Sequence, residues 1–538
     1  MYQKPLIIER TKDYAKFDCG CTIKRELRTD YFGNINYYDL PLCDKVWELF
    51  DLGLTKGIFQ LESYLGCHWG KELQVRSIQD LSDLISAIRP GMLDSKMADG
   101  KNMTWHFSER KNKREYVTYM DDCLEPILKP TQGIIVYQEQ ILKIARDIAG
   151  FSLLEANSLR KSIGKKLVSE MAKTESLFID GCKRTGKISE GNAKLLFENI
   201  RASQRYLFVK AHAVGYALLS YSTAWTKAHF PDLFITANLR DAENRIEPTK
   251  EMSEIIKEMQ SFGLEIQGPR LTDSADEFSL KGSRITFGLA NIKGLGIAKS
   301  QRIREKIGEG RNWFNILIDG LAEVDSVTSE RLCLSGYFSE LGISRQRAHF
   351  EYLTVRKLSP FELTWIKSNR TRLNDLRGTL SLMVTLYPSE KTVARKDRLI
   401  VLQDLLKSLN NPQHSLDDTP VSIHRDEVKY LGVGVTYSSL GSRGALGNTT
   451  AKEFNDGKSG KLTIAAEIKR VKEIKTKKGD LMAFLSCQDE TAELKSTIVF
   501  PGEYEKYAGF LFEGNTVLIG GERSSNGKDL IVKKVTQV

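Results

Sequence analysis

The chain has 538 residues, of which 41% are hydrophobic and 28% charged, and its 79 basic and 69 acidic residues give a net charge of +10. This is the composition of a soluble globular protein of roughly three to four domains, and the mild basic excess permits a nucleic-acid partner without requiring one. Eight cysteines in this length exclude a disulfide scaffold, and without a signal-peptide core or a run of 18 apolar residues we expect a cytoplasmic protein with no membrane partner.

The N-terminal segment, residues 1–57, mixes strand-like pieces with turns. A zinc ion needs four soft ligands in a tetrahedron. A C-x-C pair with distant partners matches common zinc spacings poorly, so the pattern favours reduced structural thiols and predicts no metal site, although zinc stays open as an alternative. The residues concerned are Cys19, Cys21, Cys43, Cys67 and His68.

Residues 58–240 are predicted to be mainly helical. Ile141, Ile144, Ala145 and Ile148 share one helical face, and Ser152 followed by Glu155 has the form of a capping box.

Tyr119-Met120-Asp121-Asp122 has the form of the carboxylate pair on a reverse-transcriptase hairpin. Pro126 and Pro130 soon after it disfavour a strand pair, so we expect a polar loop rather than a self-contained metal site.

Two basic clusters occur in the helical region. No acidic residue lies between Glu198 and Asp232, and Lys210 and His212 stand at the start of an apolar helix, where backbone donors can hold an anion. The second cluster suits a triphosphate or a nucleic-acid backbone, with a solvated helix face as the alternative. Its members are Arg160, Lys161, Lys165 and Lys166.

Residues 241–350 are expected to form short helices with glycine-bearing turns. Lys293-Gly294-Leu295-Gly296 has the shape of a helix-hairpin-helix, in which glycines let backbone N–H groups approach a phosphate. The basic helix that follows, with Lys299, favours sequence-independent DNA contact.

Residues 351–460 are predicted to form a helical connector and linker. Within it, the stretch 379–420 holds one amphipathic helix, near Leu399 to Leu409, followed by a loop, and 441–460 is a flexible linker. Residues 461–538 contain five β-rich runs separated by turns, which predict an OB-type barrel, although other small barrels fit as well. Cations on the first hairpin favour nucleic-acid binding, namely Lys469, Arg470, Lys472, Lys475, Lys477 and Lys478. The expected fold is therefore mainly α, followed by an all-β barrel.

Several stretches, in this order, resemble the bacterial C-family of replicative DNA polymerases, the DNA polymerase III alpha subunits. The resemblance runs from about residue 46 to the C-terminus, and the "CGC" near the start looks most like phage-encoded members. It implies a possible palm remnant in 1–57, fingers at 58–240, tandem helix-hairpin-helix motifs at 241–350, a connector at 351–460 and an OB domain at 461–538. The matching stretches are "TKGIFQLES" (55–63), "DLSDLISAIRPGML" (80–93), 124–166, "FVKAHAVGYALLSYSTAWTKAHFP" (208–231), "ITFGLANIKGLG" (285–296) and "EVKYLGVGVTYSSLG" (427–441).

The family adds dNTPs to a primer under the direction of a template, with two Mg²⁺ ions held on palm carboxylates. Carried onto this chain, the resemblance implies nucleotide contacts from Arg160, Lys161, Lys165, Lys210, His212, Tyr137 and Gln138. It implies DNA contacts from Lys293, Gly294, Gly296, Lys299, Lys475, Lys477 and Lys478. Val209 and Ala211 depart from the family pattern around Lys210.

The palm's Asp-x-Asp pair would lie before residue 1, and Asp18 stands in a context only loosely similar to that of the third palm carboxylate. We therefore expect the main metal ligands on a separately encoded chain, with primer-template DNA as the other partner. A catalytically inactive DNA-binding accessory protein is the alternative. Gln403 in "QDLLKSL" is a candidate start of a sliding-clamp motif.

Overall fold

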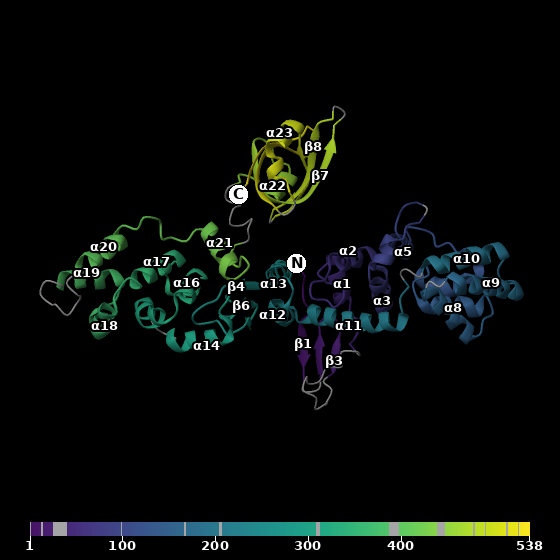
Figure 1. The fold of residues 1–538 in the computed structure, drawn as a ribbon, viewed down its shortest axis with the longest axis horizontal. Coiled ribbons are helices and arrows are strands. Elements are labelled where there is room, and N and C mark those ends of the chain that lie inside the picture. The colour runs from purple at the N-terminus through teal and green to yellow at the C-terminus, as the bar shows by residue number, and fades with distance from the viewer. Residues whose placement is uncertain are drawn as a thin grey trace. The chain divides into compact units, whose positions relative to one another are not determined.

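The computed structural model divides into two compact units, Met1–Asn238 with Lys257–Gly263, and Leu239–Ile256 with Leu264–Val538 (Figure 1). Within the described part of the chain, every helix is too short or too polar to cross a bilayer. The structure describes residues 2–11, 14–24, 40–97, 99–165, 168–203, 207–307, 312–386, 398–437, 447–476, 479–489, 491–512, 515–525 and 527–537.

The first unit begins with a three-stranded antiparallel sheet in the order β1-β2-β3 and continues in helices. The strands are β1 (Ile7–Arg10), β2 (Tyr14–Phe17) and β3 (Thr22–Lys24). The helices are α1 (Asp44–Leu52), α2 (Tyr64–Leu73), α3 (Ile78–Ala87), α4 (Pro90–Asp94), α5 (Met103–Lys111), α6 (Glu125–Leu128), α7 (Gln138–Asp147), α8 (Leu153–Lys165), α9 (Val168–Thr185), α10 (Glu190–Ser203), α11 (Lys210–His229) and α12 (Pro231–Asp241).

Helix α11 is the spine of this unit. It runs along α1 and α3 (Figure 1). Its small residues Ala213, Ala217 and Ala224 are fully buried, which lets the neighbouring helices approach closely. The same core continues through Trp225 to Phe17 of β2, so one helix joins the sheet to the helical part.

The predicted helix containing Ile141 and Ile144 is confirmed as α7, whose two isoleucines are buried. The capping box before α8 is also confirmed, since the Ser152 N–H donates to Glu155 Oε2 at 2.8 Å. The expectation of strands and turns alone in residues 1–57 was wrong, because α1 lies there. Val46, Leu49 and Phe50 have helical spacing and are all buried.

The second unit contains further short helices and a small sheet that the sequence did not predict. The strands are β4 (Glu265–Gln267), β5 (Ser279–Lys281) and β6 (Arg284–Thr286), in the order β4-β6-β5. The longer helices are α13 (Pro248–Met259), which begins in this unit, α14 (Gly296–Ile307), α16 (Ser326–Leu334), α17 (Arg345–Val355), α18 (Pro360–Ser368), α19 (Leu376–Leu386), α20 (Leu399–Asn410) and α21 (Pro420–Tyr430).

Two expectations for residues 351–460 are corrected. The predicted helix at Leu399 is confirmed as α20, but α19 precedes it where none was expected. In the region read as a linker, α22 (Ala451–Asn455) forms because Thr450 and Glu453 make a capping box. Residues 438–446 of that region lie outside the described residues.

The last five strands close into a barrel in the order β10-β11-β9-β8-β7, with β7 pairing back to β10. The OB-type prediction is confirmed: β9 and β11 are parallel neighbours, and a helix stands between the third and fourth strands. The elements are β7 (Leu462–Lys475), β8 (Leu481–Gln488), β9 (Glu493–Val499), α23 (Pro501–Tyr507), β10 (Thr516–Arg523) and β11 (Leu530–Gln537).

Candidate nucleotide- and DNA-binding sites

The candidate nucleotide site is built where α7 and α11 both begin. A parallel bridge pairs Tyr137 with Phe208, the Gln138 N–H donates to the Phe208 carbonyl at 2.9 Å, and the Phe208 N–H donates to the Val136 carbonyl at 3.1 Å. The two helices are distant in sequence, and these backbone bonds hold their first turns side by side. Side chains from both helix starts therefore share one surface.

Tyr137 lies beneath this surface and not on it. Its side chain is 1% exposed, and its hydroxyl donates to Asp83 Oδ1 of α3 at 2.5 Å. Burial raises the pKa of Tyr137 and raises the pKa of the Asp83 carboxyl to about 6. The expected contact between Tyr137 and a nucleotide is corrected: this residue positions its neighbours. Asp83 was missed because nothing in the sequence marks it among the acidic residues nearby.

The cations around this junction come from different helices. Lys210, the first residue of α11, places Nζ 5.6 Å from the centroid of the Tyr137 ring. Arg160 of α8 donates from Nη1 to Gln138 Oε1 at 3.0 Å, and Lys161 beside it is exposed. The structure thus brings together residues that the sequence placed in separate basic clusters, while the side chain of Lys165 and all of Lys166 lie outside the described residues.

The amide at the start of α11 already has an anionic partner. The Lys210 N–H donates to both carboxylate oxygens of Glu139 at 3.0 Å. A negative charge at a helix N-terminus is stabilising, so the protein's own glutamate occupies the position at which the sequence predicted a bound anion. Of Lys210, the amide N–H is thus already bonded within the protein.

An aromatic row continues along the exposed side of α11. The Arg89 guanidinium lies 3.7 Å from the centroid of the Phe208 ring, and its buried Nε has no hydrogen-bond partner. His212 is exposed and contacts both Phe208 and Tyr216, at centroid distances of 5.3 and 4.0 Å. Tyr216 in turn contacts Phe59 at 5.2 Å. The four motif stretches 55–63, 80–93, 124–166 and 208–231 therefore converge on the first half of α11.

The paired carboxylates Asp121 and Asp122 lie where a loop enters a short helix. Asp121 caps a short 3-10 helix (Asp122–Leu124) by accepting from the Cys123 N–H at 3.3 Å, and it also accepts from Asn192 Nδ2 at 3.3 Å. No strand is assigned to this fully described stretch, as the prolines predicted. Asp18 is exposed in the β2–β3 turn, where Oδ1 accepts from the Leu6 N–H at 3.0 Å.

In the second unit, Lys293-Gly294-Leu295-Gly296 forms the turn before α14. Gly294 and Gly296 have φ of 76° and 69°, a left-handed conformation that favours glycine at both positions. Lys293 is exposed, but its Nζ donates to the Val428 carbonyl at 3.3 Å. Lys299 is exposed to solvent in the first turn of α14.

The hairpin of β7 and β8 presents the cations of the barrel. Lys475 is exposed at its outer end, opposite Leu481, beyond the part of β7 that pairs with β10. Lys477 and Lys478 lie outside the described residues. In α20, Leu405 and Leu409 of the candidate clamp motif are buried, so those leucines are not presented to a partner here.

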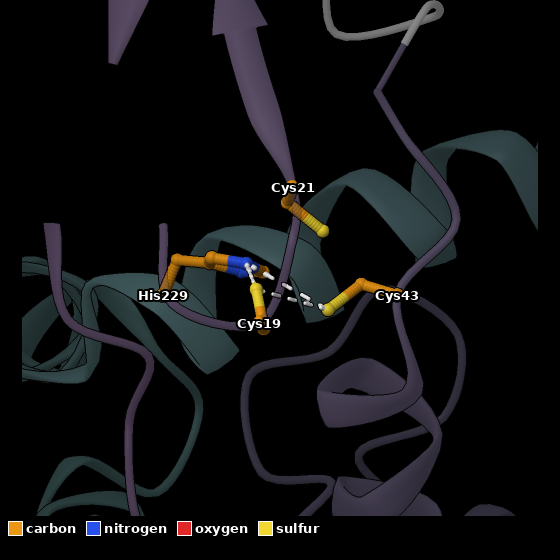
Figure 2. A group of neighbouring side chains, drawn as sticks. All are labelled: Cys19, Cys21, Cys43 and His229. Carbon is orange, nitrogen blue, oxygen red and sulfur yellow. Dashed lines mark hydrogen bonds between the residues drawn. The ribbon is translucent and has the colours of Figure 1, made fainter. Parts of the chain in front are cut away.

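A cluster of thiols lies at the other end of α11. Cys19, Cys21 and Cys43 meet His229, as Figure 2 shows. The set differs from the four cysteines considered from the sequence, because Cys67 instead donates its thiol to the Gly53 carbonyl at 3.3 Å. Burial lowers the pKa of His229 to about 4, so the imidazole is neutral at pH 7.

Comparison with known proteins matches both units. Residues 19–186 match the bacterial DNA polymerase III alpha subunit finger domain, and residues 263–348 match a helix-hairpin-helix motif. The chain is 31% identical to DNA polymerase III subunit alpha of Aquifex aeolicus over 93% of its own length and 39% of the relative's. It is 30% identical to the same subunit of Pseudomonas aeruginosa, over 95% of its own length and 44% of the relative's. For the subunit of Escherichia coli K12, the identity is 27%, over 93% of this chain and 42% of the relative. The chain thus spans about two fifths of the length of these relatives.

Proposed function

Because the chain belongs to the family of bacterial DNA polymerase III alpha subunits, we propose that it supplies the nucleotide-binding fingers and DNA-binding domains of a replicative DNA polymerase. The reaction is template-directed addition of dNTPs to a primer 3′ end. The observation that carries the proposal is the convergence of four family motifs on the first half of α11. Lys210 lies over Tyr137 there, and Arg160 binds the adjacent Gln138. We place this work in the cytoplasm of a bacterial or phage-infected cell.

In this function the cations at the junction hold the triphosphate of the incoming dNTP. Arg160 is already oriented by Gln138 and Asn157, with its Nε 3.2 Å from Asn157 Oδ1, so it loses little freedom when it binds a phosphate. Lys210 adds a point charge on a helix start that the bridge between Tyr137 and Phe208 fixes. His212 and Phe208 offer ring surfaces beside these charges.

The two Mg²⁺ ions of the reaction require clustered carboxylates. In the part of the chain that the structure describes, the one close group of three or more histidine, cysteine or acidic ligands is the thiol cluster at His229, which lacks the oxygen ligands that Mg²⁺ prefers. Asp18 is outside that group. These residues do not fit a two-magnesium site, and we propose that the carboxylates come from a second, palm-containing chain.

The DNA would be held without reading its sequence. The Gly294 turn and the exposed Lys299 suit phosphate contacts, and Lys475 suits a second contact from the barrel. Such binding is expected to weaken steeply with salt, because each neutralised phosphate releases counterions.

The test is primer extension by the purified chain, alone and with the palm-containing chain encoded beside it. We expect extension only in the mixture, and a large loss with Lys210→Ala or Arg160→Ala but not with Lys143→Ala, an exposed lysine in the middle of α7. If the mixture is inactive, and the matched dNTP does not tighten primer-template binding, the chain is the catalytically inactive accessory protein.

A further inference from the structure

Four potential metal ligands from three separate segments meet at the C-terminal end of α11. Cys19 and Cys21 flank the turn between β2 and β3, Cys43 immediately precedes α1, and His229 ends α11 (Figure 2). Their ligand atoms all lie within 4.8 Å of one another. Cys21 and Cys43 are 5% exposed and His229 is 2% exposed, so the sulfur and nitrogen atoms face each other inside the protein.

The three distances among Cys19, Cys43 and His229 match the edges of a metal tetrahedron, and Cys21 completes the group within 4.8 Å. With Zn–S of about 2.3 Å and Zn–N of about 2.0–2.1 Å, tetrahedral geometry gives S···S of about 3.8 Å and S···N of about 3.6 Å. The Sγ atoms of Cys19 and Cys43 are 3.7 Å apart, and they lie 3.6 and 3.8 Å from His229 Nε2. A disulfide requires about 2.05 Å, and these cysteines are all unbonded.

The imidazole of His229 is oriented for ligation. Its Nδ1 lies 3.0 Å from the Trp225 carbonyl, and since a carbonyl only accepts, Nδ1 carries the proton. The lone pair of Nε2 is then directed at the sulfur atoms, in the arrangement that metal-binding histidines adopt. Trp225 stacks on the ring at 3.8 Å and Phe17 meets it edge-on at 4.8 Å, which locks the orientation.

An open cavity gives an ion access to this cluster. It has a volume of about 460 Å³ and reaches Cys19 and Cys43, with the acidic side chains of Asp44 and Glu48 on its wall. Lys45 lies on the same wall and pairs with Glu48 at 2.8 Å, so Asp44 is the carboxylate there without that ion pair.

We propose that the chain binds one Zn²⁺ through Cys19, Cys21, Cys43 and His229 Nε2. Thiolates with one imidazole select a soft or borderline ion such as zinc over Mg²⁺ or Ca²⁺. Four protein ligands fill the tetrahedron and leave no open position, so the ion is structural. It fastens the β1–β3 sheet to the start of α1 and the end of α11. The site is independent of the nucleotide-binding role proposed above.

The first experiment measures zinc by mass spectrometry in the full chain purified under reducing conditions with added ZnCl₂ and then freed of unbound metal. We expect one zinc per chain, its loss in His229→Ala, and its retention in His229→Cys, which restores four ligands. Cys67→Ser is the matched control, a thiol near this core that lies outside the cluster, and should retain the ion. Wild-type protein without zinc, or equal loss in Cys67→Ser, would overturn the proposal.

A second measurement uses wild-type protein only, so it tests the proposal even if the variants fail to fold. With zinc bound, Cys19, Cys21 and Cys43 should resist alkylation and become reactive after chelation, whereas Cys67 should react equally in both states. Cobalt in place of zinc should give the intense visible bands of tetrahedral thiolate coordination. Unchanged labelling after chelation, or a disulfide between two of the three cysteines, would show that the cluster is not a zinc site.

Discussion

The two ends of helix α11 are built in opposite ways. At its start, His212 is exposed and Lys210 is half-buried, and family-like stretches of sequence surround them. At its end, His229 is buried among three thiols that come from a turn and a helix start far away in sequence. The first end carries the cations proposed to bind a nucleotide, and the second carries the buried ligands proposed to bind a structural ion.

The contrast teaches which sites a sequence reveals. The residues of the nucleotide surface lie within contiguous stretches of sequence, so sequence motifs can identify them. A closed metal site needs only four ligand atoms, and any segment can supply one. His229 lies 186 positions after Cys43, and no spacing rule links them.

The largest expected effect is on the buried end. A zinc ion present at about 1,000 times its dissociation constant stabilises the folded state by about 4 kcal/mol. Chelation should therefore lower the melting temperature of the first unit by roughly 8–16 °C, followed by circular dichroism or calorimetry. In His229→Ala the chelator should have no further effect. If chelation leaves the melting temperature of the wild-type protein unchanged, the end of α11 at His229 does not hold a stabilising ion.

The second effect concerns Asp83, the buried support of the solvent-facing end. Its pKa is about 6 in the folded state and about 3.8 when exposed, so folding binds a proton between these values. Its stabilising contribution is full below about pH 3.8 and is lost as pH rises through 6, at about 1.4 kcal/mol per pKa unit, or about 3 kcal/mol in all.

Asp83→Asn imitates the protonated acid and should gain stability relative to wild type as pH rises. Urea unfolding of both proteins at pH 4 and pH 7 measures this difference. If the difference between variant and wild type is the same at both pH values, Asp83 does not titrate as its burial indicates.

The third effect is on ligand binding at the exposed end. Lys210→Ala should weaken the dNTP-dependent tightening of primer-template binding by about 10- to 100-fold, since a charge-assisted contact is worth about 1.5–3 kcal/mol. Fluorescence anisotropy with matched and mismatched dNTPs measures it. Lys143→Ala should match wild type, and a similar loss in that control would point to nonspecific charge.

A smaller effect is expected in the second unit. Lys299→Ala should weaken DNA binding several-fold and reduce the slope of log affinity against log salt by about 1, because one phosphate contact is lost. A salt titration of duplex binding measures both. Lys407→Ala on α20, also exposed, serves as the control. An unchanged slope in Lys299→Ala would place the DNA elsewhere.

The smallest effect is expected at Asp121 and Asp122. The double substitution by Asn should leave reconstituted primer extension within about two-fold of wild type, because Asp121 serves as a cap and cap losses cost only about 1 kcal/mol of stability. Abolished extension, in protein shown to be folded, would make this pair a catalytic site.

The sequence predicted those parts of the fold that carry strong periodic patterns. The five β-rich runs alternate over seven or more residues, and they formed the barrel; Ile141 and Ile144 marked α7 in the same way. The strands β4, β5 and β6 have three residues each, too few for a period to show, and they were missed. Helix α1 has apolar residues at helical spacing, but the turn-like residues around it hid this pattern in the sequence.

For the candidate site, residue type was predictable and burial was not. Lys210 lies over the ring of Tyr137, and Arg160 binds the neighbouring Gln138. Tyr137 itself is buried, with its hydroxyl on Asp83 of α3. Glu139 on the α11 amide and Asp83 on the Tyr137 hydroxyl depend on long-range contacts that sequence spacing does not contain.

The 20 residues of α11 make it about 30 Å long at 1.5 Å per residue. If the helix moves as a rigid body, a rotation of one degree about its end at His229 displaces its start at Lys210 by about 0.5 Å. Fixing His229 in the thiol cluster therefore limits how far Lys210 can move at the other end of the same helix.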